Sequence, residues 1–249
     1  MLEALQSKIY GSGLWHRVFK TNAEADHWVE AIDRIVAWYN GEEHYHFPPP
    51  AEELKEKRFD EKKNALLTWI RVELQHATYL QDLQLRADSF VGMRVADIGS
   101  GPMPTLLVFK DCERHCIDHL LAAYKWHGFP LDEFNDSIHW IDAKTEALPT
   151  PDGFFDVIIS RDALDHVDDF AQTAREIHRA LKPGGWLHFS INYHHATSSE
   201  PQELDDHRVL AAFSGHNLRK LKELPGAWGF KTGKTVIWTN VPEDRLAPI

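Results

Sequence analysis

Cysteine is scarce in this chain, with only Cys112 and Cys116 among 249 residues. A disulfide-stapled secreted domain would need more, so we expect both to be reduced thiols in a cytoplasmic protein. Cys116 also falls in a predicted strand rather than on a helix face shared with Cys112, which disfavours a two-cysteine metal site. We therefore assign no residue as a metal ligand, and help from a divalent cation stays an open alternative.

Long apolar runs and basic clusters are missing as well. No run approaches the roughly 18 apolar residues of a membrane span, and the N-terminus lacks the pattern of a signal peptide. The net charge is −11, from 27 basic and 38 acidic residues, without a block of Lys or Arg. Such a chain is poorly suited to the phosphate backbone of nucleic acid. We expect neither a membrane nor a nucleic-acid partner.

What the chain does contain is a strand followed at once by glycines. Residues 94–102 read Arg-Val-Ala-Asp-Ile-Gly-Ser-Gly-Pro, an apolar run that predicts a buried strand and then a tight turn. Glycine allows such a turn and lets the backbone approach a ligand closely. We predict a helix over residues 103–110. A strand, a glycine turn and a helix open the nucleotide pocket of a doubly wound sheet.

Four further signals follow this turn in order. They are a strand ending in a carboxylate at residues 115–118, the run at 141–149, a buried strand at 155–160, and Leu-Lys-Pro-Gly-Gly-Trp-Leu at 181–187. In this order they resemble the class I S-adenosylmethionine-dependent methyltransferases, in particular the small "type 11" members, over about residues 94–190. Pro104 replaces the third glycine of the dinucleotide pattern, which argues against a nicotinamide enzyme.

The resemblance implies an α/β fold. It implies a doubly wound, mostly parallel seven-stranded sheet with helices on both faces (Rossmann-like) and an N-terminal helical cap. We expect the cap over residues 1–90 and the S-adenosylmethionine-binding domain over 91–249. Apolar periodicity predicts helices over about 21–40 and 60–85, and later over 201–213, with final strands at 218–224 and 235–241. Tyr10 and Trp15 stand in a glycine-containing segment that could close over the pocket as a lid.

The resemblance also assigns cofactor residues, which share a place at the carboxyl ends of the strands. Asp97, Gly99, Ser100 and Gly101 would line the methionine moiety, Asp118 would accept the ribose hydroxyls, and His119, Asp142 and Ala143 would adjoin the adenine. Ser160 and Asp162 belong to the segment that passes beneath the cofactor. Two alternatives stay open: Asp118 could cap a helix, and Asp142 could bond its own loop backbone.

Catalytic candidates come from the loops after the fourth and fifth strands. A hydroxyl acceptor loses a proton on methylation, so a base is expected, and histidine is the usual one. His166, His194 and His195 are the candidates, with Asp165 orienting His166 or capping a turn. His166 could instead have a purely structural role, and His194 and His195 could be surface residues. Asp165, His166, His194 and Glu200 could also bind a divalent cation, although their spacing is not diagnostic.

The sequence therefore predicts an S-adenosylmethionine-dependent methyltransferase acting on a small polar acceptor, with a hydroxyl of a sugar or related metabolite expected. Alternatives are N-methylation of a small molecule or protein, and a non-catalytic S-adenosylmethionine-binding regulatory module. A nicotinamide-dependent reductase would want a Tyr-x-x-x-Lys pair, but Tyr193 is followed four residues on by Thr197. A homodimer is left open.

Overall fold

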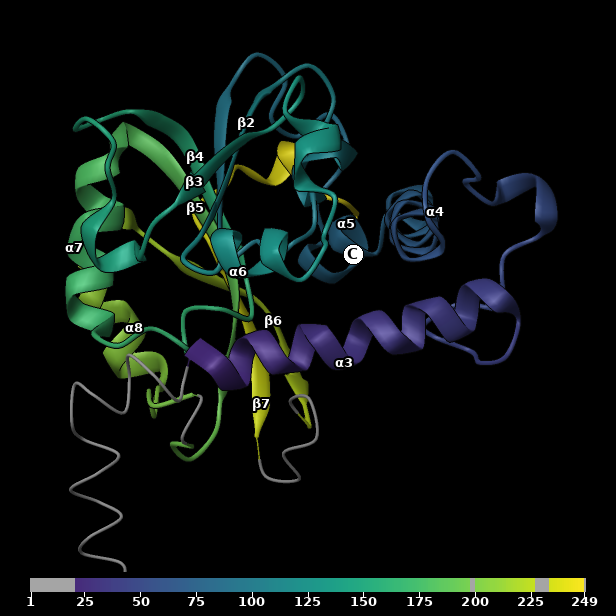
Figure 1. The fold of residues 1–249 in the computed structure, drawn as a ribbon. Coiled ribbons are helices and arrows are strands. Elements are labelled where there is room, and N and C mark those ends of the chain that lie inside the picture. Colours follow the sequence, from purple (N-terminus) through teal and green to yellow (C-terminus); the bar gives the residue numbers. More distant parts are fainter. Residues whose placement is uncertain (1–20, 198–199, 227–232, 249) are drawn as a thin grey trace, which may run out of the picture.

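The computed structural model describes residues 26–197, 200–226 and 233–248 in full, and the backbone of residues 21–25 (Figure 1). The predicted lid with Tyr10 and Trp15 lies outside these residues. Within the described part, no helix is both long and apolar enough to cross a membrane.

A seven-stranded sheet forms the centre of the molecule, as predicted. Its strands are β1 (Arg94–Ile98), β2 (Glu113–Asp118), β3 (His139–Asp142), β4 (Phe155–Arg161), β5 (Leu181–Tyr193), β6 (Arg219–Pro225) and β7 (Lys234–Thr239). They lie in the order β3-β2-β1-β4-β5-β7-β6. Strands β1 to β5 pair in parallel, and β7 runs antiparallel to both of its neighbours. The sequence order reverses between β1 and β4, which is where open α/β sheets form a ligand crevice.

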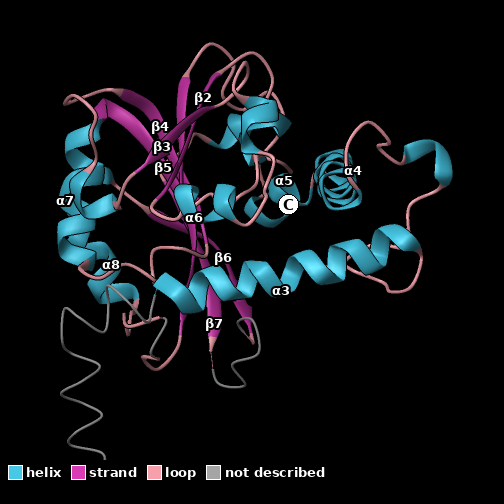
Figure 2. Cartoon of the chain, in the orientation of Figure 1, coloured by secondary structure: helices cyan, strands magenta, loops and turns pink. Residues whose placement is uncertain are grey.

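Apolar side chains alternate between the two faces of each strand, so the sheet has an apolar core on both faces. Ala96 and Ile98 of β1 share one apolar cluster with α7 (Phe170–Ala180) and α8 (Asp206–Ala212). Val95 joins a second cluster with Leu83 of α5 (Thr78–Leu83). Successive strand residues point to opposite faces, so these clusters are the two sides of the sheet. Figure 2 shows the helices on either side of the strands.

The N-terminal helices form a third cluster. Helices α3 (Thr21–Asn40) and α4 (Glu61–His76) pack on each other beyond one side of the sheet (Figure 1). Ile35, Trp38 and Leu66 share this cluster with Leu121 and Tyr124 of α6 (Leu121–Trp126), which follows β2. Helices α3 and α4 therefore pack against the sheet domain through α6 rather than forming a separate unit.

The single helix predicted over residues 60–85 is wrong, because the chain breaks at Ala77. Ala77 is left-handed, with a φ of 50°, and separates α4 from α5. The apolar face of α4 packs on α3, whereas Tyr79 and Leu83 of α5 pack against the sheet. A straight helix could not serve both neighbours, so the break redirects the chain.

Two other helices are shorter than predicted. Residues 103–110 contain only a 3₁₀ helix, Thr105–Val108, because Pro102 and Pro104 lack backbone N–H donors and β2 begins at Glu113. The helix expected over 201–213 is α8, which begins after Asp205, whose side chain accepts a hydrogen bond from the backbone N–H of Arg208.

Candidate functional site

A cavity of about 550 Å³ opens at the carboxyl ends of β1, β2 and β4, at the reversal of strand order. This volume falls in the range of small-molecule sites, roughly 300–1,000 Å³. Most of the predicted cofactor residues line it: Asp97, Gly99, Ser100, Gly101, Asp118, His119, Ala143 and Asp162. The structure thus brings these residues together, whereas their individual roles stay predictions.

The glycine turn after β1 leaves no room for side chains. Gly99 and Gly101 have φ angles of +70° and +62°, which favour glycine. A Cβ on Gly99 would lie 2.2 Å from the Cβ of Ala163, and one on Gly101 would lie 3.0 Å from Cζ2 of Trp28. Trp28 belongs to α3, so the N-terminal region contributes an aromatic wall beside the turn.

Asp118, at the end of β2, joins the glycine turn to the segment before α6. Its Oδ2 accepts a hydrogen bond from the backbone N–H of Gly101, and its Oδ1 accepts one from that of Leu120, both at 2.9 Å. Asp118 does not cap α6, whose N-cap is Leu120 without a side-chain cap; its carboxylate instead stabilises the turn that precedes this helix. Because each carboxylate oxygen accepts more than one hydrogen bond, the same group can also bind ribose hydroxyls in the cavity.

Asp97 is a buried carboxyl on the wall of the cavity. Thr105 Oγ1 donates a hydrogen bond to its Oδ2 at 2.5 Å, while its Oδ1 is buried without a donor. Burial raises the pKa of Asp97 to about 6, and Thr105 together with the nearby Tyr79 hydroxyl offsets part of this rise. Oδ1 is thus an acceptor that a donor group of a bound ligand could satisfy.

The cavity wall also contains polar groups from the segments after β4 and β5. His166 and Glu200 both line it, with His166 Nε2 3.5 Å from Glu200 Oε1. Behind them, His194 Nε2 lies 3.4 Å from Asp165 Oδ2 and 3.6 Å from Glu200 Oε2. The Asp165 carboxylate is the main reason that the pKa of His194 is raised, to about 9.

The remaining predicted site residues lie elsewhere. The side chain of His195 is 89% exposed and bonds Glu203 outside the cavity, so the surface alternative applies to it. Asp142 is exposed and is not part of the cavity wall. Ser160 is buried beneath the wall, where its Oγ donates to the carbonyl of Ile98 at 2.9 Å and ties β4 to β1.

Sequence reasoning missed several residues of the cavity wall. His27, Trp28 and Asn192 are not among the predicted site residues, yet all three line the cavity. The sequence carries no local signal for this, because α3 meets the glycine turn only through tertiary packing. The position of Asn192 near the end of β5, two residues before the candidate His194, could have suggested it.

The chain is similar to known methyltransferases. Residues 97–189 match the sequence model of a family described as "Methyltransferase domain". "Ubiquinone/menaquinone biosynthesis C-methyltransferase UbiE" of Vibrio vulnificus (strain YJ016) is 35% identical over 140 residues, covering 53% of this chain and 52% of that protein. "Uncharacterized methyltransferase YcgJ" of Bacillus subtilis is 33% identical over 97 residues, or 37% and 38% of the two chains. The chain thus spans about half or less of these relatives.

A solved structure is similar over a larger part of the chain. Geranyl diphosphate C-methyltransferase from Streptomyces coelicolor A3(2), in complex with Mg²⁺, geranyl-S-thiolodiphosphate and S-adenosyl-L-homocysteine, has a TM-score of 0.55 at 14% identity. The match covers 89% of this chain and 97% of that one, and it shows a shared fold. Residues 97–189 thus match a methyltransferase domain, and with the strand order and the glycine turn at the cavity this confirms the predicted resemblance to the class I S-adenosylmethionine-dependent methyltransferases.

Proposed function

We propose that this chain binds S-adenosylmethionine in the cavity and transfers its methyl group to a small polar acceptor, at a hydroxyl of a sugar or related metabolite. The observation that carries the proposal is the division of the cavity. The glycine turn and Asp118 line one part, and the polar pair of His166 and Glu200 lines another. A donor held at the first part would face an acceptor held at the second.

The chemistry requires little beyond positioning and removal of a proton. The acceptor oxygen attacks the methyl carbon, an O–C bond forms, the S–C bond breaks, and its electron pair returns to sulfur as S-adenosylhomocysteine. Holding donor and acceptor in line supplies much of the rate. His166 lies on the cavity wall beside Glu200, and we assign it the acceptor proton, with the carboxylate stabilising the resulting imidazolium.

The N-terminal region is part of this proposal. Because His27 and Trp28 of α3 line the cavity, we propose that residues 1–90 act as a cap beside the cofactor. Removal of the Trp28 ring by Trp28→Ala should weaken binding of S-adenosylhomocysteine while leaving the sheet domain folded.

The proposal is tested by turnover with an acceptor panel of sugars and related polyols, followed as release of S-adenosylhomocysteine. His166→Asn should lower turnover by about 10²–10⁴ with unchanged affinity for S-adenosylhomocysteine. His195→Asn is the matched control, because this histidine is exposed outside the cavity, and it should retain turnover. Retention of more than a third of turnover in His166→Asn would contradict the assigned base. Binding of NADH in place of S-adenosylmethionine would contradict the proposed donor.

A second candidate function is methylation at carbon. It is favoured by the similarity to UbiE, whose name records a C-methyltransferase. A base at the acceptor end would serve there too, since carbon also loses a proton. Nuclear magnetic resonance of the product made with ¹³C-methyl-labelled donor distinguishes an O-methyl from a C-methyl group.

A further inference from the structure

Three electron-pair donors converge where the loops after β4 and β5 meet. One ligand atom each from Asp165, His194 and Glu200 lies within 4.8 Å of the other two. Asp165 is fully buried, and so is nearly all of the His194 side chain, while Glu200 reaches the cavity. The chain separation of these residues shows that tertiary packing alone assembles the group.

The tautomer of His194 is fixed by its surroundings. Its Nδ1 lies 2.8 Å from the carbonyl oxygen of His195, which can only accept, so Nδ1 carries a hydrogen. In the neutral ring Nε2 therefore presents a lone pair, and it faces Asp165 and Glu200. Two carboxylates and a lone pair directed at one another repel, so either a proton on Nε2, in the hydrogen bond to Asp165, or a metal ion must lie between them.

A proton on Nε2 fits this geometry less well than a metal ion. A charge-assisted hydrogen bond between imidazolium and carboxylate is about 2.7–2.9 Å long. Here Nε2 is 3.4 Å from Asp165 and 3.6 Å from Glu200. With zinc bonds of about 2.0–2.2 Å to nitrogen and oxygen, two ligands at a tetrahedral angle stand roughly 3.3–3.6 Å apart.

The second carboxylate oxygen of Asp165 supports the same conclusion. Oδ1 is buried and has no hydrogen-bond donor. Because the side chain is fully inaccessible to solvent, water cannot supply one from the surface. A buried carboxylate oxygen without a donor is costly, and a cation bound by the same carboxylate would offset part of that cost.

We propose that Asp165, His194 and Glu200 bind one Zn²⁺ ion at the acceptor end of the cavity. Three protein ligands leave one tetrahedral position, the arrangement of catalytic zinc sites. Since Glu200 lines the cavity, that position can accept an oxygen of a bound molecule. The binding claim rests on the ligand geometry, and its use rests on the proposed function: zinc would orient the acceptor hydroxyl and lower its pKa.

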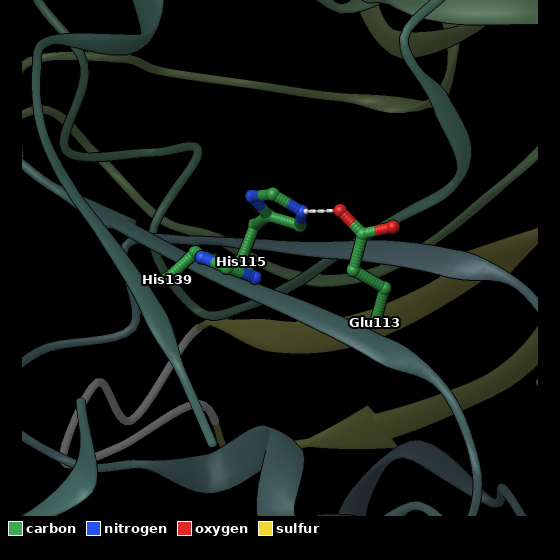
Figure 3. A group of neighbouring side chains, drawn as sticks. All are labelled: Glu113, His115 and His139. Carbon is green, nitrogen blue, oxygen red and sulfur yellow. Dashed lines mark hydrogen bonds and ion pairs between the residues drawn. The ribbon is translucent and has the colours of Figure 1, made fainter. Parts of the chain in front are cut away.

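A second group of similar composition serves as the comparison. Glu113, His115 and His139 also lie within 4.8 Å of one another, on β2 and β3 (Figure 3). Here Glu113 is already paired, because its Oε1 lies 2.9 Å from Arg94 Nε and 2.8 Å from His115 Nε2. The two imidazole rings are stacked at 4.7 Å rather than converging on a point. An arginine cation thus stabilises this carboxylate, and we propose no zinc there.

The test measures zinc itself. The full chain is stripped with a chelator, titrated with Zn²⁺ by calorimetry, and analysed for bound metal after dialysis. Wild type should bind one ion per chain, and Co²⁺ in its place should show the intense visible absorption of a tetrahedral site. Asp165→Asn and Glu200→Gln should each weaken Zn²⁺ at least about 100-fold, since loss of mere outer-shell partners costs about 10–100-fold. His139→Gln is the matched control and should bind as wild type does.

Circular dichroism and S-adenosylhomocysteine binding check that each variant is folded. If Asp165→Asn does not fold, Glu200→Gln decides, because Glu200 is partly exposed and the amide has the same shape. Absence of stoichiometric zinc in wild type overturns the proposal, as does loss of zinc in His139→Gln with retention in Glu200→Gln. Zinc binding without methyl transfer would contradict the proposed function alone. Methyl transfer by a protein that binds no zinc would overturn the zinc site alone.

Discussion

Replacement of Asp97 by asparagine is expected to remove a pH dependence from cofactor binding. The carboxyl is 1% exposed, one oxygen lacks a donor, and burial raises its pKa from 3.8 to about 6. The rise from 3.8 to about 6 corresponds to a free-energy cost of about 3 kcal/mol for ionising this buried carboxyl in the empty protein. A ligand that donates to Oδ1 would favour the ionised form, so Asp97 must lose its proton when the ligand binds.

The affinity for S-adenosylhomocysteine should therefore fall as the pH drops below about 6, by roughly tenfold between pH 7 and pH 5. Calorimetry in two buffers with different ionisation enthalpies should show proton release near pH 5.5. Asp97→Asn, which cannot ionise, should bind with nearly constant affinity over this range. Equal slopes in the two proteins would refute the placement of Asp97 against the ligand.

The same shift makes a stability prediction with a defined sign. The folded pKa is raised, so the contribution of Asp97 to stability is fully present below about pH 4 and is lost as the pH rises through about 6. Relative to Asp97→Asn, the unfolding free energy of the empty wild-type protein should fall by about 3 kcal/mol from pH 3.5 to pH 7. Urea denaturation at intermediate pH values measures this difference, and a constant difference would mean that the folded pKa is ordinary.

Gly101→Val should block S-adenosylhomocysteine binding, because a side chain there meets Trp28 and the φ of +62° is strained for valine. An unchanged calorimetric affinity in the folded variant would contradict this. Asp118→Ala should weaken the same ligand at least about tenfold, since hydrogen bonds to charged groups contribute about 1.5–3 kcal/mol each; a loss below about threefold would mean that the ribose is held elsewhere. Burial lowers the pKa of His188 to about 4. The stability that the neutral ring contributes is therefore present above about pH 6.5 and is lost as the pH falls toward 4. The stability difference between wild type and His188→Gln should therefore shrink by about 3 kcal/mol from pH 7 to pH 4, and a constant difference would show that the ring is not held neutral.

The strands and the glycine turn could be predicted because their signals are local. The apolar run before Gly99 must be buried wherever it lies, and the turn needs residues without a Cβ. The same holds for the Leu-Lys-Pro-Gly-Gly segment, which directly follows α7 and begins β5. The alternation of these strands with helices also indicated a mostly parallel sheet, since parallel strands need crossover connections.

The break at Ala77 could not be predicted in the same way. The residues around it have an apolar periodicity that suits one helix, and nothing local marks Ala77 as left-handed. The two halves bury their faces against different partners, α3 and the sheet. The fold therefore outweighs the local preference, because the apolar area buried on both sides exceeds the strain of one left-handed residue.

The sequence by itself determined which residues could carry the chemistry, and the tertiary structure decided which of them meet. His194 and His195 are adjacent and were equivalent candidates, yet one ring is buried against Asp165 and the other is exposed. Neighbouring residues on an extended segment point to opposite sides, and only the packing of the β4 and β5 loops selects the inward one. Trp28 reaches the glycine turn for the same reason. Such contacts join distant parts of the chain, and their geometry is set by the burial of the whole core rather than by any local pattern.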